Sequence, residues 1–369
     1  MTVATASTDA IDEHRTDVDP TSTGARSRLR IVRLLVAVGL IVIFAPMAAD
    51  AGVGVWTGSL ALGLAYSLTA IGVYITFRVL DFPDLTVDAS FPAGAAVAAV
   101  LFTNSVTPWL SLPGAFLVGA LFGVITGVAH IALRINSLLA SILTVTAAFT
   151  INLRLQGSAN VSLLGADTVY SPFLTPMRDL LESMFGDTGV QIHRNVVTAL
   201  VAGAVLLVAV VVLHLFFRTE VGIALRATGA NPRMSRAQGI DTRVYIVGGV
   251  ALSNALIGVS GALVAQHQGF ADVNSGAGLI IAGLAAVIIG EVLFVGRSTA
   301  VWRHLIGVSL GMIIYRAAIG VTLATDLDLP FLPALRLEPT DVRLATAVVV
   351  GALLAVPRIR TWRWGRRAT

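Results

Sequence analysis

Cysteine and lysine are both absent from this chain of 369 residues. Without cysteine the chain has no disulfide, no thiolate nucleophile and no cysteine-ligated metal. All 25 basic residues are arginine, so a Walker A phosphate loop and a lysine Schiff base are excluded too. The six histidines lack the H-E-x-x-H spacing of a zinc site. The sequence therefore predicts no metal and no cofactor, and it contains no ATP-binding motif of its own.

Charged residues are also scarce. They make up 12% of the chain, whereas a soluble domain has about 25%. Hydrophobic residues make up 56%, and the mean hydropathy is +0.85. Because only lipid can cover so much apolar side chain, the composition predicts a membrane protein.

Ten stretches are apolar over roughly the 17 to 25 residues that a membrane-spanning helix needs. They comprise residues 31–49, 57–78, 85–103, 113–134, 137–153, 196–217, 244–266, 277–296, 304–324 and 342–357. We therefore predict an all-α polytopic membrane protein of about ten transmembrane helices. The transmembrane domain covers residues 29–357, between a disordered cytoplasmic tail (1–28) and a basic cytoplasmic tail (358–369).

The arginines favour one orientation of these helices. If the N-terminus is inside, the outer loops carry only Arg154, Arg178, Arg194, Arg336 and Arg343. The inner loops and tail then carry Arg78, Arg134, Arg297, Arg303 and the arginines within residues 218–243 and 358–369. Because cytoplasmic loops are enriched in basic residues, both termini are predicted to be cytoplasmic. Ten helices form two five-helix halves, and an odd number per half requires the halves to be inverted.

A faint internal repeat agrees with inverted halves. The stretch that begins Phe82-Pro-Asp-Leu resembles the stretch that begins Phe270-Ala-Asp-Val, and each leads into an apolar stretch. In the predicted topology these two helices are entered from opposite sides of the membrane. The alternative is that the stretches share only a composition rich in small residues, which is common in membrane helices.

Glycine recurs every four residues in two of the apolar stretches. The positions are Gly119, Gly123 and Gly127 in residues 113–134, and Gly307 and Gly311 in residues 304–324. This spacing predicts close packing between helices and requires no ligand.

Residues 80–92, LDFPDLTVDASFP, form the most polar interruption in the first half of the chain. Proline and acidic residues at membrane depth predict backbone that leaves the helix and lines protein or water. Transporters tend to place a substrate site at such a break, so Asp84 and Asp88 are candidate residues of a substrate path. The alternative is an ordinary loop, in which Asp88 caps the helix that follows.

The same segment also permits an enzymatic interpretation. Asp81, Asp84 and Asp88 have the D-x-x-D-x-x-x-D spacing with which membrane prenyltransferases hold Mg²⁺ and a diphosphate. Such an enzyme needs a second aspartate cluster that faces the first. The only candidates, Asp326 and Asp328, lie across the membrane in the predicted topology.

Further polar residues lie within or beside the apolar stretches. Thr146, Thr150 and Asn152 lie in residues 137–153, and Glu291 lies near the end of residues 277–296. Ionisable groups at such depth are candidates for function, although hydrogen bonds between helices are the alternative role. Arg154, just outside its stretch, could hold a substrate carboxylate with two hydrogen bonds or could anchor the helix at the interface.

The loop of residues 219–243, TEVGIALRATGANPRMSRAQGIDTR, has an ordered pattern. It predicts a short helix over 221–227, a turn at Gly229-Ala-Asn231-Pro232, and a second short helix that ends at Gly239. Such a helical hairpin between two spans is suited to dock on a soluble partner. A solvated basic loop, the alternative, explains the arginines but not the pattern.

This loop carries a family resemblance. Residues 220–241, EVGIALRATGANPRMSRAQGID, resemble the coupling-loop signature of ATP-binding-cassette importer permeases of the branched-chain amino acid and ribose type. Three more segments resemble the subgroup of uncharacterised or tryptophan/tyrosine-type permeases: RVLDFPDLTVDASFPAGAAVAAV, LLASILTVTAAFTINLRLQGSAN and IIAGLAAVIIGEVLF. The resemblance covers about residues 60 to 320.

The resemblance implies a permease subunit in the plasma membrane, not an enzyme, that translocates a small solute such as an amino acid. Its partners would be a cytoplasmic ATPase subunit, an extracellular solute-binding protein and a second permease subunit, identical or related, within membrane lipid and without nucleic acid. The residues expected to contact the ATPase are Glu220, Gly222, Arg226, Gly229, Asn231, Pro232 and Gly239. The alternatives are the prenyltransferase and an ion-coupled secondary transporter that needs no ATPase.

Overall fold

A computed structural model describes residues 52–165, 167–295 and 300–324 of the chain. Several predictions lie outside these residues and stay predictions. They are the two tails, the apolar stretches 31–49 and 342–357, and the cytoplasmic location of both termini.

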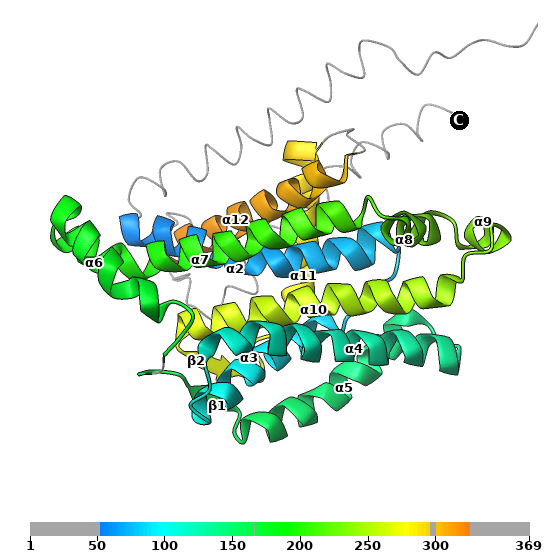
Figure 1. The fold of residues 1–369 in the computed structure, drawn as a ribbon, viewed down its shortest axis with the longest axis horizontal. Coiled ribbons are helices and arrows are strands. Elements are labelled where there is room, and N and C mark those ends of the chain that lie inside the picture. Colours follow the sequence, from blue (N-terminus) through cyan, green and yellow to red (C-terminus); the bar gives the residue numbers. More distant parts are fainter. Residues whose placement is uncertain (1–51, 166, 296–299, 325–369) are drawn as a thin grey trace, which may run out of the picture. The chain divides into compact units, whose positions relative to one another are not determined.

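The other eight predicted stretches coincide with helices (Figure 1). These are α2 (Val53–Tyr74), α3 (Val87–Thr103), α4 (Ser111–Leu133), α5 (Ser137–Gln156), α7 (Asp187–Phe216), α10 (Thr242–Gln268), α11 (Leu279–Gly290) and α12 (Val301–Ala324). Among the described residues, six helical segments are long and apolar enough to cross a membrane, whereas α3 and α11 are shorter. The prediction of a helical, polytopic membrane protein is therefore confirmed.

Shorter elements join these helices. The π-helical turns η1 (Ile75–Val79) and η3 (Glu291–Val295) continue α2 and α11, and the 3₁₀ turn η2 (Pro108–Leu110) precedes α4. Between the spans lie α6 (Ser171–Phe185), α8 (Glu220–Ala230), α9 (Pro232–Ala237) and the strands β1 (Asn160–Ser162) and β2 (Phe270–Asp272). The strands pair antiparallel, with Val161 opposite Ala271.

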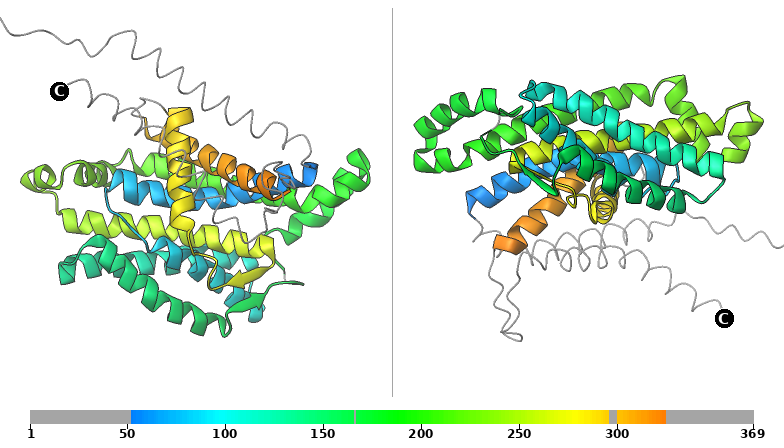
Figure 2. Two further views of the ribbon diagram at one scale, coloured as in Figure 1. Left: turned by 180° about the vertical axis from the view of Figure 1, so that it is seen from behind. Right: turned by 90° about the horizontal axis from the view of Figure 1, so that it is seen from below.

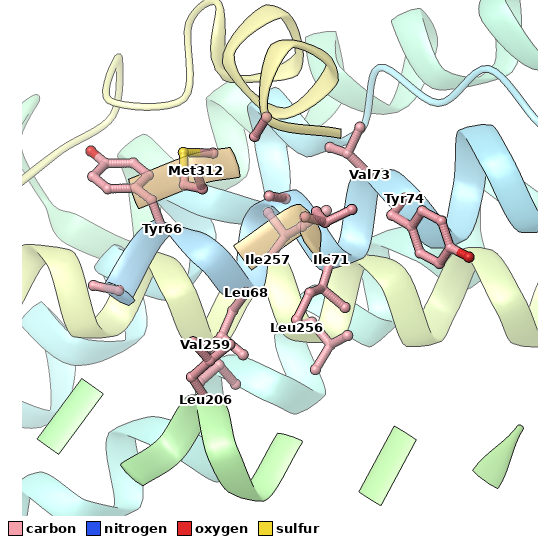
Figure 3. Close-up of a cluster of buried hydrophobic side chains, with 14 of the residues drawn as sticks. Tyr66, Leu68, Ile71, Val73, Tyr74, Leu206, Leu256, Ile257, Val259 and Met312 are labelled. Atoms are coloured by element: carbon pink, nitrogen blue, oxygen red, sulfur yellow. The ribbon is translucent and has the colours of Figure 1, made fainter. Parts of the chain in front are cut away.

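Helices α2 and α10 form the centre of the described structure. In the apolar stretches of α2 and α10, 78% and 72% of the residues are buried, whereas in those of α4 and α5 the share is 28% each. Figure 3 shows side chains of α2 gathered with residues of α7, α10 and α12, among them Tyr66, Ile71, Leu206, Ile257 and Met312. Since lipid is as apolar as these side chains, close packing rather than escape from water holds the centre together.

The glycine repeats lie where helices approach closely, as predicted. A Cβ atom at Gly123 of α4 would lie 2.5 Å from the Val250 carbonyl oxygen of α10, and a Cβ at Gly119 would overlap the Asn254 carbonyl oxygen. On α12, a Cβ at Gly311 would overlap the backbone of Ala286 in α11. These glycines allow backbone contact between helices and face no cavity.

The two short helices meet at their N-termini. Asp88, in the first turn of α3, accepts hydrogen bonds from the backbone N–H groups of Gly278 and Ile280 at the start of α11, each at 3.3 Å. The chain enters α3 from the end of the bundle that carries α8 and enters α11 from the end that carries β2 (Figure 1). Helix α11 then crosses the neighbouring helices instead of running along them (Figure 2).

The loop between α5 and α7 contains structure that the sequence did not predict. Helix α6 exposes Leu180, Met184 and Phe185, and β1 pairs with a segment more than a hundred residues away. Neither element has a long apolar stretch, and strand pairing depends on which loops come together at one end of the bundle. Periodicity alone detects neither feature.

Candidate functional site

Residues 219–243 form the predicted helical hairpin. The Thr219 hydroxyl accepts a hydrogen bond from the Gly222 N–H at 3.3 Å and caps α8. Asn231 alone separates α8 from α9, and its Oδ1 accepts from the Met234 N–H at 3.0 Å. Pro232 is the first residue of α9, where its missing N–H costs no helical bond. The turn is thus shorter than predicted, because Gly229 and Ala230 belong to α8.

The hairpin ends at a glycine, as predicted. Gly239 has a φ of +83°, in the left-handed region that favours glycine. Its N–H donates to the Arg236 carbonyl, and the Ile240 N–H donates to the Ser235 carbonyl, each at 3.0 Å. This pair of bonds is a Schellman motif, which satisfies the last carbonyls of α9.

Two glycines seat the hairpin on the ends of membrane helices. A Cβ at Gly229 would overlap the Val79 carbonyl oxygen, and a Cβ at Gly222 would overlap the Phe216 carbonyl oxygen. Leu225, between them, is 2% exposed. Backbone contact at two points therefore fixes α8 to η1 and to the end of α7.

The other side of the hairpin faces outward. The remaining predicted coupling residues are exposed: Glu220, Arg226, Asn231, Pro232 and Gly239. The hairpin thus offers a surface to a partner from an element that is fixed to the membrane helices.

The break before α3 is closed by a buried hydrogen-bond network. Asp84 is 0% exposed, and its Oδ1 accepts from the Thr86 N–H at 2.8 Å. Its Oδ2 accepts from the Asn254 side-chain amide at 2.7 Å, and the Asn254 Oδ1 accepts from the Ser90 hydroxyl at 2.8 Å. Both carboxylate oxygens are therefore bonded within the protein, and Asp84 has no surface for a solute in this conformation.

A chain of threonines extends this network. The Thr86 and Thr126 hydroxyls lie 2.7 Å apart, and the Thr126 hydroxyl donates to Thr144 at 2.9 Å. The chain links the segment before α3 to α4 and α5. The break is therefore held by side chains from three different helices, counting Asn254 of α10.

The three aspartates of the prenyltransferase hypothesis do not converge. Asp81 is exposed with a φ of +53°, Asp84 is bonded to Asn254, and Asp88 caps α11. In the described part of the chain no group of three acidic or histidine side chains could hold a metal ion. Asp326 and Asp328 lie outside the described residues. Asp88 is a helix cap, but for α11 rather than for its own helix.

The candidate residues on α5 divide between two faces. Asn152 is 1% exposed and donates to the Ala89 carbonyl of α3 at 3.2 Å. Thr146, Thr150 and Arg154 are exposed and follow one another at intervals of four residues. They therefore form one polar stripe along the outside of the helix.

Glu291 lies at the end of the bundle that carries α8. Its Oε1 accepts from the Arg78 guanidinium Nε at 2.8 Å and lies 3.7 Å from the His304 Nδ1. The pair joins η1 to η3, two π-helical turns of a kind often found at functional positions. The sequence indicated neither Arg78 nor Thr126 as a site residue. The arginine was explained by orientation alone, and the threonine has no motif around it.

Comparisons with known proteins agree with the membrane architecture. A family model described as "Branched-chain amino acid transport system / permease component" matches residues 55–354. The chain is 33% identical to a tyrosine transport system permease protein of Clostridioides difficile, over 82% of this chain and 90% of the relative. It is 30% identical to a probable branched-chain amino acid transport permease protein, LivH, of Methanocaldococcus jannaschii, over 68% of this chain and 78% of the relative. It is 32% identical to a nucleoside ABC transporter permease protein, NupC, of Lactococcus lactis, over 51% of this chain and 58% of the relative.

No solved structure matches the chain. The relatives are transport components rather than enzymes, and their family works in general with an ATPase and a solute-binding protein. Together with the six apolar helices, they establish a multi-pass protein of the plasma membrane. The chain belongs to the permease components of branched-chain amino acid transport systems and is the membrane-spanning subunit of an ATP-binding-cassette importer.

Proposed function

We propose that the hairpin α8–α9 is the coupling loop, on which a separate cytoplasmic ATPase subunit docks. The observation that carries the proposal is that α8 packs by backbone contact on two membrane segments: Gly222 contacts the end of α7, and Gly229 contacts η1. A force applied to the exposed side therefore reaches two membrane helices without passing through a flexible joint. The side of the membrane that carries α8 is then the cytoplasmic side, as the arginine distribution predicts.

The two short helices support a transport mechanism built on inverted halves. Segments 82–86 and 270–274 each contain an Asp that accepts a hydrogen bond from the N–H two residues later, at 2.8 Å. They lead into α3 and α11 from opposite ends of the bundle. We infer that the halves rock about this junction and expose a site between them alternately to each side.

An amino acid is the proposed substrate class. The tyrosine and branched-chain amino acid permeases among the relatives favour it over the nucleoside of the third. The stripe of Thr146, Thr150 and Arg154 supplies hydroxyls and a guanidinium, and a guanidinium can hold an amino acid carboxylate with two hydrogen bonds. A polar stripe on the outside of a membrane helix favours contact with a water-filled path and a second permease subunit over contact with lipid.

A matched pair of glycine substitutions tests the coupling loop. Gly229→Ala places a methyl group against the Val79 carbonyl, whereas Gly248→Ala in α10 adds one where nothing lies within 4 Å. The full chain would be co-expressed with its ATPase, purified through a tag, and assayed for the co-purifying ATPase and for uptake of radiolabelled tyrosine, leucine and a nucleoside in vesicles. We expect Gly229→Ala to lose most uptake and ATPase stimulation, and Gly248→Ala to retain both.

Equal activity in the two variants would overturn the coupling role of the contact between α8 and η1. Uptake driven by an ion gradient in vesicles that lack any ATPase would support the secondary transporter instead. Uptake of the nucleoside without either amino acid would overturn the substrate class and leave the coupling role intact.

A further inference from the structure

A cavity of about 220 Å³ lies between α8 and the ends of the membrane helices. Its lining comes from α2, η1, α8, α12 and the residue that ends α7, and it includes Tyr74, Arg78, Phe217, Arg226, Gly229 and His304. It opens beside Gly229, on the side of α8 that contacts η1, and the exposed Arg226, one of the predicted coupling residues, lies at its mouth. We call it the arginine pocket.

The charges of the arginine pocket do not balance. Arg78 is paired with Glu291 at 2.8 Å, and the same carboxylate oxygen lies 3.7 Å from the His304 Nδ1. Among the described residues no acidic side chain lies within ion-pair distance of Arg226. Within the described part of the chain, one guanidinium charge is therefore uncompensated at the mouth of a cavity that also holds a second guanidinium and an imidazole. Such a site attracts an anion.

The position of the pocket indicates which anion. It lies where the membrane-length segments Val53–Val79 and Val301–Val321 end and begin. The ends of such segments are where a boundary between lipid and water is expected. Trp302, 44% exposed, lies next to the pocket residue Val301, and the Arg303 guanidinium lies 5.4 Å from its ring centroid. Tryptophan and arginine at a helix end are typical of residues at the headgroup level. Basic pockets between helices on the cytoplasmic side bind anionic headgroups.

We propose that the arginine pocket binds a phosphate group, carried by an anionic phospholipid of the cytoplasmic leaflet. Guanidinium groups suit phosphate because their planar N–H donors match its oxygens in pairs. The assignment to the cytoplasmic leaflet rests on the proposed function. A phosphate there would join Arg226 of α8 to Arg78 of η1, so anionic lipid would hold the coupling loop against the ends of the membrane helices.

Two arginine substitutions with equal loss of charge test the site. Arg226→Gln removes a guanidinium from the pocket, whereas Arg233→Gln removes one from the exposed surface of α9 outside it. The full chain in detergent would be titrated with phosphatidylglycerol and, separately, phosphatidylcholine, and the dissociation constants measured by native mass spectrometry. We expect tighter binding of phosphatidylglycerol to the unmodified chain, weakened about fivefold by Arg226→Gln and unchanged by Arg233→Gln.

A second variant guards against misfolding. Ala230→Glu adds a carboxylate to the rim of the pocket at an exposed position and should weaken phosphatidylglycerol binding in the same direction. Thermal unfolding with inorganic phosphate separates the two sources of phosphate. Stabilisation by free phosphate, without preference for phosphatidylglycerol, would overturn the lipid as the source.

Three other results would overturn the site. Equal weakening by Arg226→Gln and Arg233→Gln would show only general attraction to a basic surface. No preference for phosphatidylglycerol over phosphatidylcholine would exclude an anionic headgroup. Unchanged lipid binding in Arg226→Gln, with loss of the co-purifying ATPase, would assign the pocket to an acidic side chain of that subunit. Because lipid binding is measured without the ATPase, failure of the coupling role would not alter these constants.

Discussion

The two segments that lead into α3 and α11 have similar sequences and the same local turn, yet they are stabilised differently. Before α3, Asp84 is fully buried and bonded to Asn254 of α10. Before α11, the Asp272 carboxylate bonds within the described residues only to the backbone N–H of Asn274, a residue that is exposed. Helix α11 has no capping side chain of its own and takes Asp88 from α3. Asp84 before α3 and Asp88 in its first turn therefore supply carboxylates to both junctions, and loss of either should cost more than loss of Asp272.

Replacement of Asp84 should have the largest effect. Asp84→Ala leaves the buried Thr86 N–H and the Asn254 amide without their acceptor, so we expect the free energy of unfolding to fall by about 2 to 3 kcal/mol. Unfolding of the full chain by sodium dodecyl sulfate in mixed micelles measures it. Asp179→Ala, an exposed aspartate of α6, is the control and should change little. Equal stability of the two variants would contradict the buried network.

Asp88 should come next. Asp88→Ala removes the cap of α11 and should lower the free energy of unfolding by about 1 to 2 kcal/mol. Asp88→Asn keeps one carbonyl oxygen, which can accept one of the two bonds, so it should lose about half as much. The same unfolding assay measures both. If Asp88→Asn unfolds like the unmodified chain but transports no solute, Asp88 contacts the substrate as well.

A smaller effect is expected along the threonine chain. Thr126→Val keeps the shape of the side chain but breaks the link between Thr86 and Thr144, at a cost of about 1 kcal/mol. Thr146→Val is the matched control, because among the described residues that exposed hydroxyl bonds only to the Ile142 carbonyl of its own helix. A chemical unfolding series on both variants, read by tryptophan fluorescence, would reveal the difference. Identical unfolding midpoints would show that the hydrogen bonds between the threonines contribute nothing to stability.

Asp272 should matter least. Asp272→Ala removes one local bond at the edge of the bundle, so the free energy of unfolding should fall by about 0.5 kcal/mol or less. Thermal unfolding of the purified chain in detergent, beside Asp84→Ala, measures the ratio of the two effects. A loss as large as that of Asp84→Ala would make the two segments equivalent and remove the contrast between them.

The sequence predicted the helices and the hairpin well. Eight of the ten apolar stretches are helices in the described residues, and Gly239 ends the hairpin as its residue type suggested. These features depend on local rules. A long apolar stretch in lipid must satisfy its own backbone hydrogen bonds, and a glycine readily adopts the left-handed conformation that ends a helix.

The sequence predicted the roles of single polar residues less well. Asp88 was expected to line a path or to cap the helix that follows it. It caps α11 instead of its own helix, about 190 residues away, and its place in a substrate path stays a prediction. The spacing of Asp81, Asp84 and Asp88 suggested one metal site, yet their side chains lie in three environments. Helix α6 was not predicted, because its apolar residues form no long stretch.

The sequence by itself determined where the chain crosses the membrane as helices, because lipid imposes length and hydropathy on each stretch separately. It also determined the hairpin, whose caps lie within a few residues of the groups that they satisfy. Only the tertiary structure decided which acidic residue serves which helix, and that Arg226 faces a pocket with Arg78 and His304. Those pairings join residues far apart in the chain, and no local periodicity records which helices pack together.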